Sequence, residues 1–405
     1  MREIVLINVT GKDKPGLTAS LTNILAQYNV SILDIGQAVI HDYLSLWILV
    51  EIPVEHASSS ILKDLLFAAH KLGIQIRFSA VDADSHENWS SHEGQQRRII
   101  TLLGRKLTGE KLAKIAKAIA DNNLNIDVIT RLSGLISPND RTTKSKACIR
   151  FNVSGNLKEP GQFRGRLLEI SNHTGIDISF HVDDIFKHAR RLVVFDMDST
   201  LIQGEVINQL AHAHGVGRQV AEITESAMSG ELDFKESLIR RTSLLKGLDE
   251  GVLFETAENL TLSEGTEYLA TTLKSLGYKL GIISGGFDYF GKYLQTKLNL
   301  DYVFANELEV SGGKVTGKIK GDIIDGPKKA EILKTIAMVE NIKLQQTIAV
   351  GDGANDLPMI SIAGLGVAFH AKPVVKQNAN QTISSVGLDG LLYLMGISER
   401  EIRGN

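Results

Sequence analysis

The sequence predicts an α/β protein of three domains, in which two small α+β domains precede a larger domain built on a doubly wound parallel sheet. Residues 3–80 show strand and helix patterns in the order β-α-β-β-α-β, and residues 99–181 repeat that order. After residue 190, short apolar runs typical of buried parallel strands alternate with helical segments. The length of 405 residues exceeds what one hydrophobic core usually supports, which also favours several domains.

Composition and charge narrow the class of protein. The formal net charge is −3 and basic residues are interspersed with acidic ones, so we expect no nucleic acid as partner. No apolar run approaches the ~20 residues of a membrane span, and the N-terminus becomes polar too soon for a signal peptide. The single cysteine, Cys148, suits a reducing compartment. We therefore expect a cytoplasmic protein that does not bind membranes.

The first small domain is expected to span residues 1–82. Its strands are predicted at residues 3–9, 31–40, 44–52 and 75–80, and its helices at 17–28 and 58–72. This order gives the split β-α-β pattern of a ferredoxin-like domain. The polar segment that follows, residues 82–96, has the composition of a surface linker.

The second small domain is expected to span residues 97–184 and to repeat the first. Its strands are predicted at residues 99–103, 126–133, 146–153 and 177–181, with helices at 109–122 and 163–174. Residues 123–126 (Asn-Leu-Asn-Ile) echo residues 29–32 (Asn-Val-Ser-Ile). The two copies agree in the order of their elements more than in identity.

Residues 11–16 (Gly-Lys-Asp-Lys-Pro-Gly) join the first strand to the first helix. A Pro-Gly turn before a helix leaves backbone N–H groups that can bind a carboxylate, although a plain tight turn fits the same residues. With this segment the first domain resembles the ACT family of amino-acid-binding regulatory domains. The resemblance implies serine or another amino acid as effector at a subunit contact, hence a homodimer. The second copy has Leu-Thr-Gly at 107–109 instead, which favours a packing role there.

The third domain, residues 190–405, carries acidic residues after a buried strand. The apolar run 192–195 leads directly into Asp196, and Asp198 follows two positions later. Ligands of open α/β sheets bind at the C-terminal ends of the strands, and strand alternation would put both carboxylates on a similar side. Such a pair favours a hard cation, and one acid can be the nucleophile while the other donates a proton. Alone, the pair also fits a capped strand end or part of a calcium loop.

Three later segments add phosphate-binding chemistry in a fixed order. Residues 279–283 form an apolar strand that ends at Ser284 and Gly285, which can hold phosphate oxygens. A lysine, Lys328 or Lys329, opens a helix near Pro327 and can bring a cation to a phosphoryl group. A third apolar strand, residues 347–350, precedes the acidic loop 351–356. Individually these segments also fit a helix cap, a solvated lysine and a turn.

Taken together, the four segments resemble the haloacid dehalogenase-like superfamily over residues 191–385. The resemblance implies a Rossmann-like domain in which Asp196 is the nucleophile and Asp198 is the acid and base. It implies a Mg²⁺ ion held by Asp196, the backbone carbonyl of Asp198, and Asp352. The family spacing selects Lys329 over Lys328. Residues expected to bind phosphate or support the site are Ser284, Gly285, Lys329, Asn355 and Asp356.

The insertion at about residues 203–262 is expected to form a helical cap over the site, with helices at 203–213, 217–229 and 234–245. A phosphorylated amino acid needs a carboxylate for its ammonium group and a cation for its carboxylate. Glu205 and Arg241 can supply them, since arginine grips a carboxylate through two parallel hydrogen bonds. Each of these residues alone also fits a solvated charge.

The cap residues resemble those of the phosphoserine phosphatase family, through residues 198–201, Glu205, 228–230, Phe234, 237–238 and 241–245. By this resemblance Met228 and Phe234 line the apolar inner side of the cap and exclude water. It implies hydrolysis of O-phospho-L-serine to L-serine and phosphate through an aspartyl-phosphate, the last step of serine biosynthesis. Phosphoryl transfer to another alcohol such as homoserine is the alternative. A non-catalytic amino-acid sensor is disfavoured because it needs no such set of catalytic residues.

Overall fold

The computed structural model describes residues 3–53, 58–82, 96–135, 145–228, 232–379 and 381–403. The chain forms two compact units, Met1–Gln95 and Gln96–Asn405. In the described part of the chain, no helix combines the length and the apolar character that a membrane span requires.

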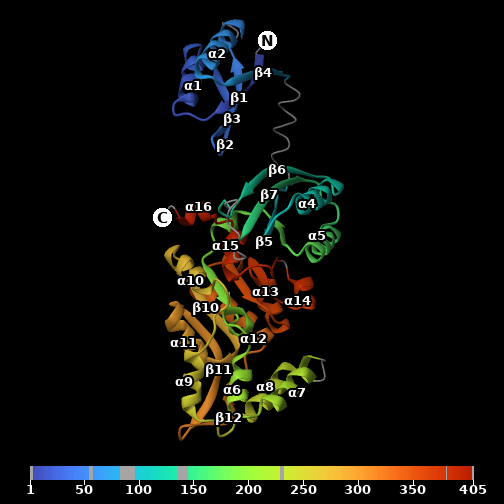
Figure 1. Cartoon of the computed structure of the whole chain (residues 1–405), viewed down its shortest axis with the longest axis vertical. Coiled ribbons are helices and arrows are strands. Elements are labelled where there is room, and N and C mark those ends of the chain that lie inside the picture. Colours follow the sequence, from blue (N-terminus) through green and yellow to red (C-terminus); the bar gives the residue numbers. More distant parts are fainter. Residues whose placement is uncertain are drawn as a thin grey trace. The chain divides into compact units, whose positions relative to one another are not determined.

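The first unit is a four-stranded antiparallel sheet packed against two helices (Figure 1). The strands lie in the order β2-β3-β1-β4, as the ferredoxin-like prediction requires. One face of each helix is buried at regular spacing, with Leu17, Leu21 and Leu25 on the first helix. The elements are β1 (Glu3–Lys12), α1 (Leu17–Gln27), β2 (Ser31–Ile40), β3 (Tyr43–Ile52), α2 (Ser58–Leu72) and β4 (Gln75–Val81).

The second small domain belongs to the second unit and repeats this topology, with strand order β6-β7-β5-β8. Its residues Leu103, Leu132 and Cys148 join the hydrophobic core of the third domain. The two domains are therefore packed together as one body. The elements are β5 (Arg98–Gly104), α4 (Gly109–Asp121), β6 (Leu124–Arg131), β7 (Ala147–Gly155), α5 (Pro160–Thr174) and β8 (Asp177–Val182).

The third domain has a seven-stranded sheet in the order β12-β11-β10-β9-β13-β14-β15, which is parallel except for β12. On β9, Val193 and Phe195 face one hydrophobic cluster while Leu192 and Val194 face another. Both faces of the sheet are thus covered, which confirms the doubly wound prediction. The strands are β9 (Leu192–Phe195), β10 (Lys279–Phe287), β11 (Tyr302–Ser311), β12 (Lys314–Lys320), β13 (Thr347–Gly351), β14 (Leu365–Phe369) and β15 (Gln381–Ile383).

Helices cover this sheet, and further helices form the insertion between β9 and β10, which is called the cap below (Figure 1). Against the sheet lie α10 (Thr266–Ser275), α11 (Asp288–Leu298), α12 (Gly326–Val339), α13 (Leu357–Ile362), α14 (Pro373–Asn378) and α15 (Leu391–Leu394), and α16 (Glu399–Arg403) follows. The cap contains α6 (Val206–Ala213), α7 (Gly217–Met228), α8 (Phe234–Ser243) and α9 (Glu250–Glu258). Helix α9 is not among the helices predicted from the sequence.

The two chain segments that join the cap to the sheet run side by side. Ile202 on the outgoing segment forms an antiparallel bridge with Leu262 on the return segment. At its far end the cap is tied to β12, because Gly247 N–H donates to the Val315 carbonyl and Val315 N–H to the Leu248 carbonyl. The cap is therefore anchored at both ends to the sheet domain.

Candidate active site

Asp196 lies where the central strand β9 ends, between the ends of β10 and β13. The residue is 5% exposed, and its N–H donates to the Val350 carbonyl of β13 at 2.8 Å. Because β9 is paired with both neighbours in parallel, all three strands deliver their following loops to the same edge. This edge collects the acidic and phosphate-binding residues that the sequence predicts.

Asp198 reaches the same place through a turn. The strand ends at Phe195, and residues Met197–Leu201 form a tight turn in which Asp198 and Ser199 have non-helical backbone angles, with a φ of 55° at Ser199. The prediction that strand alternation places Asp198 beside Asp196 is therefore wrong in its geometry. One carboxylate oxygen of Asp198, Oδ1, accepts from the N–H of Val206 at 2.8 Å. Asp198 is thus tied to the first residue of the cap helix α6.

Lys329 is fully buried and holds two carboxylates together. Its Nζ lies 2.9 Å from Oδ1 of Asp196 and 2.6 Å from Oδ1 of Asp356. Burial alone would lower the pKa of Lys329, but the charges of Asp196 and Asp356 raise it above the ordinary value. Lys328 instead pairs with Glu331 on the surface, at 3.0 Å. The structure thus places Lys329, and not Lys328, at the end of β9.

Three carboxylates, those of Asp196, Asp352 and Asp356, have oxygens within 4.8 Å of one another. Both carboxylate oxygens of Asp356 are hydrogen-bonded to protein groups, because Oδ1 accepts from Lys329 and Oδ2 accepts from the Gly353 N–H at 2.9 Å. Burial, followed by the charges of Asp196 and Asp356, raises the pKa of Asp352 to about 8. One lysine does not balance three carboxylates, so this oxygen-rich cluster fits a hard divalent cation.

Asp198 is suited to holding a proton. Burial and the nearby charge of Asp196 raise the pKa of Asp198 to about 7, although the Val206 N–H favours the ionised form. A carboxyl group with such a pKa can donate and accept protons near neutrality. Asp196 and Asp198 therefore differ in their surroundings, one beside an ammonium group and the other beside a backbone amide.

Gly285 and Gly286 of β10 form a wall that approaches the site closely. A Cβ at position 286 would lie 2.5 Å from Oδ2 of Asp198, and one at position 285 would lie 2.6 Å from Cζ of Phe234. The buried Ser284 Oγ accepts from the Gly286 N–H at 3.0 Å. The wall therefore needs glycine at both positions, and Phe234 at the start of α8 brings the cap into contact with it.

Two supporting residues were missed by the sequence analysis. Asn306 on β11 donates to the Gly285 carbonyl at 2.8 Å and accepts from Ile324 N–H at 2.9 Å, which fixes the wall. Asp325 caps α12, the helix of Lys329, and pairs with Lys235 of the cap at 2.9 Å. The Asp-Gly-Pro segment before that helix is a capping signal, whereas nothing local marks Asn306.

The predicted substrate-binding pair in the cap lies together. Arg241 is 8% exposed and its Nη1 lies 3.0 Å from Oε2 of Glu205. Among the described residues, Nε of Arg241 and the hydroxyl groups of Ser237 and Thr242 are buried without a hydrogen-bond partner. Unpaired buried donors are costly, and a ligand with acceptor oxygens would satisfy them.

The remaining predicted residues take different positions. Asn355 is half-buried in the short turn Ala354–Asp356 that follows β13, beside the acidic cluster. The side chain of Met228, at the end of α7, lies outside what the structure describes.

Comparisons with known proteins agree with this geometry. The ACT domain family matches residues 3–79, and the haloacid dehalogenase-like hydrolase family matches residues 190–364. Phosphoserine phosphatase of Streptomyces coelicolor is 39% identical over 398 residues, which cover 98% of this chain and 93% of that protein. The chain belongs to the phosphoserine phosphatase family.

Other relatives of this family extend the comparison. Phosphoserine phosphatase of Mycobacterium tuberculosis is 38% identical over 402 residues, with 98% of this chain and 94% of that protein covered. A crystal structure of a probable phosphoserine phosphatase from Vibrio cholerae, unliganded, matches with a TM-score of 0.57 and 34% identity, covering 76% of this chain and 89% of that one. The predicted family resemblance and fold class are confirmed.

The buried lysine gives a direct test of the site's electrostatics. Lys329→Met leaves Asp196 and Asp356 buried without their cation, so we expect the free energy of unfolding to fall by about 3–5 kcal/mol. Lys328→Met is the matched control, since that side chain is 38% exposed, and should change the value by ~0.5 kcal/mol or less. Urea denaturation at neutral pH without added metal measures both. Equal effects would contradict the assigned role of Lys329.

Proposed function

We propose that this chain is a phosphoserine phosphatase that hydrolyses O-phospho-L-serine to L-serine and phosphate through an aspartyl-phosphate on Asp196. Residues 190–405 form the phosphatase domain in this proposal, and residues 203–262 its cap. The observation that carries the proposal is Asp196 held by buried Lys329 at 2.9 Å, next to an acid with a pKa of about 7. Membership of the phosphoserine phosphatase family supports the choice of substrate.

The two aspartates divide the reaction between them. An oxygen of Asp196 attacks phosphorus and the bond to the seryl oxygen breaks, while Asp198 gives its proton to that leaving oxygen. Asp198 then takes a proton from water, whose oxygen attacks phosphorus and displaces the Asp196 carboxylate. The raised pKa of Asp198 suits both the donation and the return of the proton.

Bound phosphate needs positive charge and hydrogen-bond donors. Lys329 supplies the charge, and the Ser284 hydroxyl, the Gly285 backbone and Asn355 supply donors around the equatorial oxygens. The resident cation in our proposal is Mg²⁺, held by the carboxylates of Asp196 and Asp352 and the backbone carbonyl of Asp198. When bound, Mg²⁺ offsets the negative charge of the carboxylates and of the phosphoryl group. Asp356 supports the site by holding Lys329 in place.

The cap supplies recognition of the amino acid. Glu205 binds the ammonium group of the substrate and Arg241 binds its carboxylate. Substrate binding therefore replaces the ion pair of 3.0 Å between these two side chains. The unpaired donors of Arg241 and its neighbours support a carboxylate as ligand. Phe234, whose ring end would lie 2.6 Å from a Cβ at position 285, excludes water from the acyl-phosphate when the cap is closed, and the family resemblance assigns the same role to Met228.

The first test of this proposal removes the nucleophile. Asp196→Asn should lower magnesium-dependent phosphate release from phosphoserine by roughly 10³-fold or more, because amide oxygen is a poor nucleophile. Asp198→Asn should lose roughly 10²–10⁴-fold through the missing proton donor. Steady-state phosphate release with and without magnesium measures both. With homoserine present, the amount of phosphate released should equal the amount of serine formed, because transfer to homoserine would release serine without phosphate. Full activity in Asp196→Asn would contradict the role of Asp196 as the nucleophile.

A second test addresses the cap. Arg241→Ala should raise KM for phosphoserine by roughly 10- to 100-fold through the lost carboxylate contact, and should change hydrolysis of phosphoethanolamine much less. Arg240→Ala is the matched control, because Arg240 is 54% exposed and pairs with Glu236. The measurement compares kcat/KM for phosphoserine and for phosphoethanolamine in the unaltered chain and in both variants. A proportional loss on both substrates in Arg241→Ala would argue against carboxylate recognition.

We propose in addition that the first ACT domain binds serine or another amino acid near residues 13–16, at a contact between two copies of this chain. Gly16 (φ 89°) precedes helix α1 as its N-cap residue and provides no side-chain cap, which supports ligand binding by the backbone N–H groups of the first turn. Serine should therefore inhibit the full chain, and a chain starting at residue 96 should lose that inhibition. Unchanged inhibition in the shortened chain, measured as phosphate release against serine concentration, would reject this site.

A further inference from the structure

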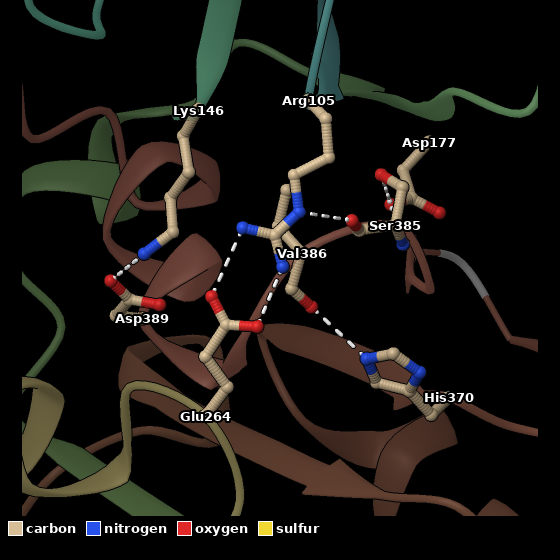
Figure 2. Close-up of polar contacts among 8 residues, drawn as sticks. All are labelled: Arg105, Lys146, Asp177, Glu264, His370, Ser385, Val386 and Asp389. Carbon is tan, nitrogen blue, oxygen red and sulfur yellow. Dashed lines mark hydrogen bonds and ion pairs between the residues drawn. The ribbon is translucent and has the colours of Figure 1, made fainter. Parts of the chain in front are cut away.

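The second small domain contacts the phosphatase domain through a cluster of charged and polar groups (Figure 2). Arg105, Lys146 and Asp177 come from the small domain, and their partners come from the segments before α10 and after β15. Asp177 accepts from the N–H groups of Ser384 and Ser385, at 2.9 and 2.8 Å. Lys146 pairs with the largely buried Asp389. The cluster thus joins two rigid parts of one body.

Arg105 makes the most directional contact of this cluster. Its Nη1 and Nη2 donate to the two carboxylate oxygens of Glu264 at 3.0 and 2.6 Å, and its Nε donates to the Ser385 carbonyl at 3.0 Å. Figure 2 shows the guanidinium group between these two partners. Glu264 is 48% exposed, so the pair adds little to stability. The two parallel bonds instead fix the direction of the Glu264 side chain.

Glu264 belongs to the segment through which the cap returns to the sheet. It follows Leu262, which forms the antiparallel bridge with Ile202, by two positions. The backbone carbonyl of Glu264 accepts from the Leu388 N–H at 2.7 Å. The next residue, Gly265, has a φ of 82°, and a Cβ there would lie 2.2 Å from Oδ1 of Asp389, the partner of Lys146. The second small domain therefore reaches this return segment directly through Glu264 and indirectly through Asp389.

The return segment is also bonded to the turn that carries Asp198. Ser263 N–H donates to the Leu201 carbonyl at 2.9 Å, and the Thr266 hydroxyl donates to the same carbonyl at 3.3 Å. Leu201 ends the turn that begins at Met197, next to the nucleophile. A short chain of contacts thus runs from Arg105 through Glu264 to the return segment and on to the turn Met197–Leu201.

We infer that Arg105 is a positioning residue for the phosphatase reaction, which fixes the return segment of the cap on the second small domain and so favours the closed cap. This inference rests on the proposed function. Arg105 touches no reacting atom, so its loss lowers the fraction of molecules with a closed cap rather than the chemistry inside it. Apparent substrate affinity falls by that fraction. The second small domain thereby takes part in substrate binding from outside the site.

The test compares KM and kcat in the full chain with phosphoserine as substrate. Arg105→Gln and Glu264→Gln should each raise KM about 3- to 10-fold and leave kcat within about twofold, and the double variant should match either single one. Arg105→Lys keeps the charge but not the two parallel bonds, and should raise KM as well. Gln381→Leu is the matched control, since Gln381 donates to the Phe180 carbonyl at 3.2 Å across the same domain contact and belongs to β15, not to the return segment. Its KM should stay within about twofold of the unaltered chain.

The outcomes separate the possibilities. An unchanged KM in Arg105→Gln and Arg105→Lys, with thermal unfolding showing folded protein, overturns the inference. An equal rise of KM in Gln381→Leu also overturns it, because the effect would then come from domain contact in general. Absence of phosphate release from the unaltered chain rejects the proposed function instead.

Discussion

A single buried ammonium group, that of Lys329, makes the rest of the site possible. Asp196 and Asp356 are both buried at the end of β9, and two such carboxylates would repel each other or take up protons without a cation. Lys329 lies within 2.9 Å of both, so its positive charge offsets theirs and holds the Asp196 carboxylate in place at the end of the strand. It does not neutralise Asp352, and the charge that remains is what draws a divalent cation to this edge of the sheet. The helix that carries Lys329 is capped by Asp325, which also holds the cap through Lys235.

The cap adds selectivity to this charged centre. Its segments leave and return side by side at Ile202 and Leu262, and Asp198 is bonded to the first residue of its first helix. In our proposal the proton donor Asp198 is therefore bonded directly to the cap that carries the substrate-binding pair Glu205 and Arg241. A site of this kind can exclude water while the aspartyl-phosphate exists and admit it afterwards. The second small domain is packed on the same body and contacts the return segment of the cap through Arg105 and Glu264.

Local patterns in the sequence predict much of this arrangement. The apolar run before Asp196 predicts a buried strand, and the rule for strand ends then gathers Ser284 and Asp352 at one edge. The sequence does not predict how Asp198 arrives, because one non-helical turn with a positive φ at Ser199 replaces the expected strand. Contacts between distant side chains are also invisible to local patterns. Arg105 and Glu264 are 159 residues apart, and both look like ordinary surface charges until the fold brings them together.

The aspartyl-phosphate on Asp196 is the central claim, and trapping it is the most direct measurement. The unaltered chain is mixed with magnesium and phosphoserine, quenched in acid within milliseconds, and its peptides are analysed by mass spectrometry after borohydride reduction. The account predicts that the reduced residue, homoserine, appears at position 196 in the presence of substrate and is absent from Asp196→Asn. Modification at another residue, or phosphate release in a burst without any modification at position 196, would contradict it.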